Sequence, residues 1–154
     1  MGFGMMKLPR FLLGPAMPPS IERRVYGPDS SPEEIAAIQA RLSRYNADTF
    51  VWEEMPIQSP FSVEVMLREI QRQTANLPSF NLVVNLTQAE PPPQEVRTAL
   101  YRSLDALTNM KRCACYTGRN FLLNAAAKFV LVAVRVKVTV HKTLEEALRD
   151  VGAA

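Results

Sequence analysis

Hydrophobic and polar residues follow two different periodicities along this chain, and the two alternate from residue 49 onward. Short apolar or strictly alternating runs, typical of strands, occur at 49–55, 81–86, 111–116 and 135–140. The segments that follow them have apolar residues at every third or fourth position, as one face of a helix does: 60–77, 93–107, 120–132 and 143–151. This order predicts an α/β fold with a mixed, mainly parallel sheet of four or five strands flanked by helices.

The first 45 residues precede this alternation and are predicted to be an N-terminal extension, which leaves residues 46–154 as the α/β domain. Residues 1–20 are rich in proline, glycine and methionine, a composition that indicates a tail. Residues 21–26 predict a short edge strand. A serine at position 31, followed by proline and then by Glu34, predicts a capped helix that ends near Tyr45.

The composition is that of a single domain with a modest positive charge. A chain of 154 residues that is 47% hydrophobic has enough apolar material for one core. The net charge is +3, but the segment between Asp105 and Glu145 has no acidic residue and contains seven Lys and Arg residues. Such a segment could face an acidic protein, an anionic lipid or a phosphate. Solvated ends of strands and helices would account for the same charges.

The cysteines and the apolar runs indicate where in the cell the protein is expected. Cys113 and Cys115 are two residues apart on a predicted strand, so they point to the same face and are poorly placed to form a disulfide. Buried reduced thiols are typical of a cytoplasmic protein. The apolar run at 11–13 breaks at Gly14-Pro15, too soon for a secretory signal. The run at 121–134 is shorter than the about 20 residues of a membrane span, so an integral membrane protein is not expected.

Residues 80–151 resemble the STAS family, whose best-known members are bacterial anti-sigma-factor antagonists. The resemblance is carried by Asn-Leu-Val-Val-Asn-Leu-Thr-Gln at 81–88, by the predicted helix from Pro93, by Cys-Ala-Cys-Tyr at 113–116 and by Val138–Leu148. It implies a STAS-like fold and a non-enzymatic role in signalling, as a regulatory module that binds a protein partner.

In the switchable members of that family, the loop after the central strand carries Asp-Ser-Ser-Gly and is phosphorylated. The corresponding positions here are Pro93, Gln94, Glu95 and Val96, which contain no hydroxyl group. The resemblance therefore implies an interaction surface without a phospho-switch at this loop, with Gln94 and Glu95 at the start of a helix.

The carboxyl ends of the predicted parallel strands are the second basis for a site. Ligands of open parallel sheets bind outside these ends, where this chain has Thr87-Gln88, Thr117–Asn120 and His141–Thr143. We therefore predict a protein-binding surface there; the alternative is a small anionic ligand or lipid headgroup gripped by Arg119 and by backbone N–H groups. Plain turns and helix caps would also explain these residues. The candidate binding residues from both arguments are Gln88, Gln94, Glu95, Gly118, Arg119, Asn120 and His141.

Other chemistry finds little support in the residues. The single histidine, His141, has no activated nucleophile near it in the sequence. Glu53 and Glu54 are adjacent on a strand, so their carboxylates should point to opposite faces. No glycine-rich phosphate loop or metal-ligand cluster occurs, and aromatic residues are sparse in the basic segment. We therefore expect no enzyme, no cofactor, no metal and no nucleic-acid binding; the sequence does not indicate an oligomeric state.

Overall fold

The protein has an α/β architecture built on one five-stranded sheet. The structure is a computed structural model that describes residues 21–119 and 136–153. The strands follow one another across the sheet in chain order: β1 (Leu42–Arg44), β2 (Thr49–Glu53), β3 (Phe80–Asn85), β4 (Met110–Tyr116) and β5 (Val138–His141). β1 is antiparallel to β2, and the other three pairs are parallel. The predicted fold class, including the parallel pairing of β3 with β4, is confirmed.

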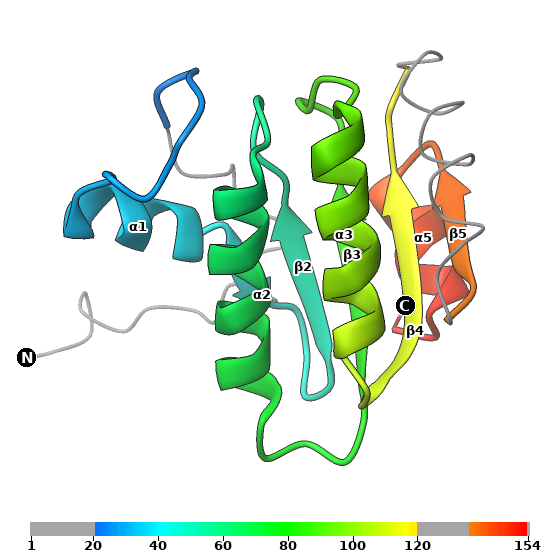
Figure 1. Cartoon of the computed structure of the whole chain (residues 1–154). Coiled ribbons are helices and arrows are strands. Elements are labelled where there is room, and N and C mark those ends of the chain that lie inside the picture. The colour runs from blue at the N-terminus through cyan, green and yellow to red at the C-terminus, as the bar shows by residue number, and fades with distance from the viewer. Residues whose placement is uncertain (1–20, 120–135, 154) are drawn as a thin grey trace, which may run out of the picture.

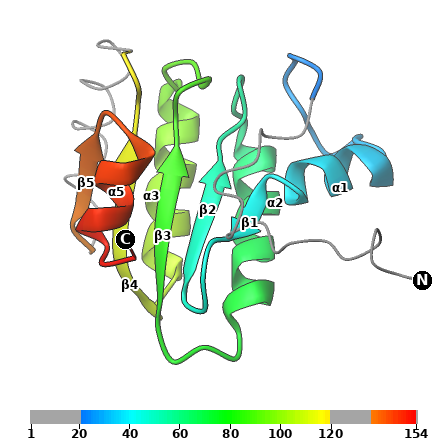
Figure 2. The ribbon, with the colours of Figure 1, turned by 180° about the vertical axis from the view of Figure 1, so that it is seen from behind.

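Helices cover the sheet on both faces. The described helices are α1 (Pro32–Gln39), α2 (Pro60–Thr74), α3 (Gln94–Ala106) and α5 (Leu144–Asp150). α2 and α3 lie side by side on one face (Figure 1). α5 lies on the opposite face, over β3, β4 and β5 (Figure 2). α1 lies beyond the β1 edge and contacts α2.

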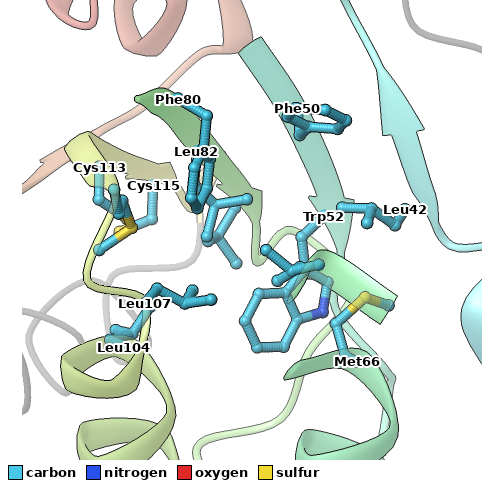
Figure 3. Close-up of a cluster of buried hydrophobic side chains, with 13 residues drawn as sticks. Leu42, Phe50, Trp52, Met66, Phe80, Leu82, Leu104, Leu107, Cys113 and Cys115 are labelled. Atoms are coloured by element: carbon cyan, nitrogen blue, oxygen red, sulfur yellow. The ribbon is translucent and has the colours of Figure 1, made fainter. Parts of the chain in front are cut away.

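The larger core lies between the sheet and the pair α2–α3. Alternate residues of the central strands enter it, among them Phe50, Trp52, Leu82 and Cys113 (Figure 3). Phe50 and Phe80 meet edge to face, with ring centroids 6.1 Å apart. Cys113 and Cys115 both belong to this cluster as free thiols, as their spacing on one strand predicts. The apolar face that the sequence predicts for α2 and α3 is therefore buried against the sheet.

The smaller core lies between the sheet and α5. The intervening residues of the same strands, Val51, Val83 and Ala114, meet Ala147 and Leu148 of α5. Ala114 and Ala147 have no exposed surface. Small side chains on both sides let the helix approach the strands closely, so even this short helix buries the middle of the sheet.

Capping side chains define the helix starts. Ser31 and Glu34 make both hydrogen bonds of the predicted capping box. Thr143 accepts from the backbone N–H of Glu146, whereas the carboxylate of Glu146 accepts from Lys142 N at 3.3 Å rather than from Thr143 N. The sequence Thr-Leu-Glu-Glu at 143–146 also predicts a capping box, and this box is only half formed. Pro93 is the N-cap of α3, one residue before the helix.

Two predictions for the N-terminal part are wrong. Residues 21–26 form no strand: the chain bends there, Tyr26 Oη donates to Glu22 O at 3.0 Å, and the Arg24 guanidinium lies 4.0 Å from the centre of the Tyr26 ring. These local contacts bury Tyr26 in a small cluster with Ile38 and Met55 instead of pairing its backbone with a neighbour.

The second error concerns the helix that was predicted to end near Tyr45. α1 ends at Gln39, and Leu42–Arg44 pair with β2 as an antiparallel edge strand. Cross-strand hydrogen bonds and the burial of Leu42 in the larger core outweigh the local helical pattern. Residues 42–44 therefore belong to the sheet, although the predicted α/β domain begins only at residue 46.

Parts of the other predicted elements lie outside the described residues. These are the tail at 1–20, the helix at 120–132 with its cap Asn120, and the first residue of the last strand. Where the last strand is described, it runs over Val138–His141.

We expect Leu82→Ala to lower the free energy of unfolding by about 3 kcal/mol, because it leaves a cavity at the centre of the larger core. Leu82 is fully buried on the middle strand of the sheet. Urea denaturation with an unchanged m-value would measure the loss. Val25→Ala is the control, since Val25 is 61% exposed and should change stability by less than about 0.5 kcal/mol. Equal effects of the two substitutions would contradict this core.

Candidate functional site at the carboxyl edge of the sheet

The carboxyl ends of the parallel strands meet along one edge of the molecule, as predicted. Backbone hydrogen bonds continue past the strands and hold the following residues together: Leu86 N donates to Tyr116 O at 2.9 Å, and Gly118 N to Lys142 O at 3.0 Å. We call the residues at 86–90, 117–119 and 141–143 the rim. The loops that contain them lie at the same end of the sheet (Figure 1).

Gly118 has a conformational role in the rim. Its φ is +63°, in the left-handed region that glycine adopts without strain. A Cβ at this position would also lie 3.3 Å from the Thr87 side-chain methyl group. The glycine therefore lets the turn after β4 approach the turn after β3, and it presents the exposed Arg119 beside it.

A partly buried polar network beside the rim was not predicted. Glu53, Asn85 and Tyr116 end three adjacent strands and are paired in register. The Asn85 amide donates to the Glu53 carboxylate, and Asn85 Oδ1 accepts from both the backbone and the hydroxyl of Thr87, at 2.9 and 2.7 Å. The network ties the strand ends to the rim. In the sequence, the only sign of this network is a polar residue at the end of each apolar run. That these three residues lie side by side is visible only from the strand register of the sheet.

The Tyr116 hydroxyl stays protonated in this environment. Burial raises its pKa above the ordinary value, and the negative charges of Glu53 and Glu145 raise it further. Tyr116 can therefore act as a hydrogen-bond donor but not as a phenolate base near neutral pH.

The carboxylates of Glu53 and Glu54 have different partners: that of Glu53 accepts from the Asn85 amide, and that of Glu54 accepts from Met55 N at 2.8 Å. Arg41 spans both residues: Nε donates to Glu53 O at 2.9 Å and Nη2 to Glu54 O at 3.0 Å. Burial raises the pKa of Glu54 to about 7, although the Met55 N–H and the Arg41 charge favour its ionised form. Glu54 is 2% exposed, so it is a structural group and lies out of reach of a ligand at the surface.

The loop between β3 and α3 is held at its middle and exposed at its end. Glu90 N donates to Pro56 O at 2.9 Å, and the Glu90 carboxylate forms an ion pair with Arg23. Ala89 is buried, whereas Gln88 and Glu90 on either side of it are exposed. The three prolines that follow lead to Gln94 and Glu95, both of them exposed at the start of α3.

His141 lies on the rim through its backbone, which accepts from Thr117 N at 3.0 Å, but its ring contacts other residues. Its Nε2 lies 3.0 Å from Thr139 Oγ1 and 3.1 Å from Asp150 Oδ2, and its Nδ1 lies 4.0 Å from Glu146 Oε2. These partners belong to β5 and α5, so the ring is directed toward α5 in its described contacts. The predicted residues Gln88, Gly118 and Arg119 do lie on the rim.

Three of the described backbone donors near the rim already have partners. Gly118 N and Lys142 N donate to Lys142 O and Glu146 Oε2, and Glu146 N donates to Thr143 Oγ1. The buried Glu53 carboxylate beside the rim would also oppose a second negative charge. This geometry favours exposed side chains, rather than a backbone cradle, as the binding elements.

The thiols of Cys113 and Cys115, in the larger core, are not activated as nucleophiles. Burial raises the pKa of Cys115 to about 12, and burial together with the neighbouring thiol raises that of Cys113 still further. Neither thiol is therefore a nucleophile near neutral pH. In the residues that the structure describes, no group of His, Cys, Asp and Glu side chains could hold a metal ion.

Comparison with known proteins does not assign the site. No protein-family model matches the chain, and no curated protein is significantly similar to it. Within 21–119 and 136–153, no helix has the length and apolar character needed to cross a membrane.

We expect Gly118→Ala to lower the free energy of unfolding by about 1–2 kcal/mol, because any side chain there would be held in a left-handed conformation. Urea denaturation would measure the change. Gly27→Ala is the matched control: Gly27 lacks a positive φ, and its nearest neighbour is the mobile end of the exposed Asp29 side chain. A loss at Gly27 as large as that at Gly118 would show that left-handed backbone is not the cause.

We expect the stability of the wild-type protein to fall, relative to Glu54→Gln, as pH rises from about 4.5 to about 7. The pKa of Glu54 lies near 7 in the folded protein, above its ordinary value of 4.5. The folded state therefore binds the proton more tightly, and this stabilisation is complete below 4.5 and lost as pH passes 7. The difference should reach at most about 3 kcal/mol.

Urea denaturation at several pH values between 4 and 8 would measure this dependence. Glu33→Gln is the control, because Glu33 is exposed in the first turn of α1. Parallel pH profiles for the wild type and Glu54→Gln would refute the buried carboxyl group as the source.

Proposed function

We propose that this chain is a non-enzymatic regulatory module that binds a protein partner through the rim and the adjoining start of α3. The supporting observation is that exposed polar side chains are mounted on a fixed backbone frame at the carboxyl edge of the sheet. Gln88 and Arg119 lie on the rim, and Gln94 and Glu95 begin α3. Side chains of this kind can give a partner specific hydrogen bonds and ion pairs.

The rigidity of the frame supports binding. Hydrogen bonds from Leu86, Thr117 and Gly118 to the neighbouring strand ends leave the turns little freedom. A surface that is already ordered loses less conformational entropy when a partner docks. The proline run at 91–93 adds to this, because proline restricts φ in both the free and the bound state.

The state of the buried groups supports binding over catalysis. Cys113, Cys115 and Tyr116 are buried, and burial keeps each of them protonated near neutral pH. The side chains proposed to bind the partner, Gln88, Gln94, Glu95 and Arg119, are by contrast exposed. Free buried thiols also agree with a cytoplasmic location, which we propose for this module.

The relationship to the STAS family remains part of the proposal. A central apolar strand followed by a parallel neighbour agrees with the resemblance of residues 80–151. Parallel sheets also occur in many unrelated proteins, so the fold alone cannot carry the assignment. The loop before α3 contains no hydroxyl group between Gln88 and Thr98, so a STAS-like module of this sequence would bind without phosphorylation there.

Affinity capture with a charge-reversed rim tests the proposal. The tagged full chain and the variants Arg119→Glu and Gln94→Lys would be incubated with lysate, and retained proteins quantified by mass spectrometry. We expect a defined protein to be retained by the wild type and reduced about tenfold or more by either variant, because interface side chains near the centre of a contact dominate its energy.

Arg102→Glu is the control for this experiment. Arg102 is exposed on α3, and it lies eight residues beyond Gln94, about 12 Å further along the helix. A partner lost equally on Arg102→Glu, or retained by both rim variants, would place binding elsewhere. If instead no protein is enriched and Arg119→Glu alone abolishes a thermal shift with phosphate, the rim binds small anions and the proposal fails.

A further inference from the structure

A second concave site lies at the amino edge of the sheet, opposite the rim. A pocket of about 320 Å³ is enclosed by the start of β4, the start of β5 and the end of α5. We call it the basal pocket. Its volume lies at the lower end of the range for sites that bind small molecules, which begins at about 300 Å³.

An irregularity in β4 shapes this pocket. Phe80 pairs with Met110 and Asn81 pairs with Arg112, so Lys111 is an extra residue on β4. The insertion explains why Met110 and Cys113, three residues apart, enter the same core. Such bulges redirect side chains and occur preferentially beside functional sites.

The neighbouring strand leaves the redirected side chains uncovered. β5 begins its pairing at Val138, opposite Cys113, so the residues of β4 before Cys113 extend past it. Lys111 and Arg112 are both exposed and line the pocket, and Lys137 joins them from the residue before β5. Three cationic side chains, two from β4 and one from the residue before β5, therefore surround one depression.

The charge of the pocket is unbalanced. Among the described ranges 21–119 and 136–153, no carboxylate forms an ion pair with Lys111, Arg112 or Lys137. Asp150 is the one acidic residue in the lining, and its Oδ2 is engaged by the Thr139 hydroxyl and by His141. Three positive charges thus face one carboxylate, which Arg112 is near enough to influence electrostatically.

Part of the pocket lining is apolar. Cys113 and Val151 are 2% and 3% exposed and contribute to its lining, together with Val136. A bare inorganic ion would leave this surface unused. A small organic anion could place its charge among the cations and an apolar group against the valines.

We propose that the basal pocket binds a small organic phosphate monoester. A phosphate dianion can pair with the Arg112 guanidinium through two oxygens and with the two lysines through the charge that remains. A singly charged carboxylate would leave more of the cationic excess uncompensated. The ester group lies against Cys113, Val136 and Val151.

An NMR titration of the full chain tests this inference. Phenyl phosphate is the probe, added at constant ionic strength while backbone amide shifts are recorded. We expect saturable shifts confined to residues 111–113, 137–139 and 150–151. Arg112→Gln and Lys137→Gln should each weaken binding about tenfold, because each removes a charge-assisted contact.

Arg68→Gln is the matched control, since Arg68 is exposed on α2 and does not line the pocket. It should leave the affinity for phenyl phosphate unchanged. Amide dispersion of each variant verifies folding before the titration, and the two independent pocket variants keep the test decisive if one is unstable. The inference is overturned by linear or scattered shifts, by shifts on the rim, by equal weakening in Arg68→Gln, or by benzoate binding as tightly as phenyl phosphate.

Discussion

The in-register parallel pairing of β3 with β2 and β4 is the constraint on which the rest of the structure depends. It aligns Val51, Val83 and Ala114 on one face and Trp52, Val84 and Cys115 on the other. Each face then becomes a continuous apolar surface that a helix must cover. A shift of one residue would exchange the faces and expose both cores, so hydrophobic burial specifies the register strongly. The smaller core depends on it most, because the contact of Ala114 with Ala147 lets α5 approach the strands closely.

The same register brings polar groups together at both edges of the sheet. At the carboxyl edge, Glu53, Asn85 and Tyr116 fall in one row and connect the strand ends to the turns of the rim. At the amino edge, the extra residue on β4 and the later start of β5 expose Lys111 and Arg112 beside a pocket. The two edges differ in character. The first is a set of fixed turns with mixed polar side chains, suited to a protein surface; the second is a cationic depression with a partly apolar lining, suited to a small anion.

The parts of the fold that could be predicted are those in which local pattern and tertiary environment agree. α2, α3 and the central strands have strong periodicity, and the Ser31 capping box operates within three residues. The errors lie where a distant partner decides. Leu42–Arg44 form a strand because β2 offers a free edge, and Tyr26 turns inward to Ile38 and Met55 instead of extending. Of the site, the rim could be predicted from strand polarity, whereas the ring of His141 is held by Asp150 from a helix whose position no local pattern specifies.

The sequence by itself determined the α/β class and the order of its main elements, because these follow from side-chain periodicity and the two-residue repeat of a strand. Only the tertiary structure decided which polar residues meet. The Glu53–Asn85 contact joins residues 32 positions apart, and the basal pocket combines β4, β5 and α5. Such contacts depend on strand register and on where a helix settles across the sheet. Both are set by the packing of the whole core, and a periodicity read within one segment contains no information about either.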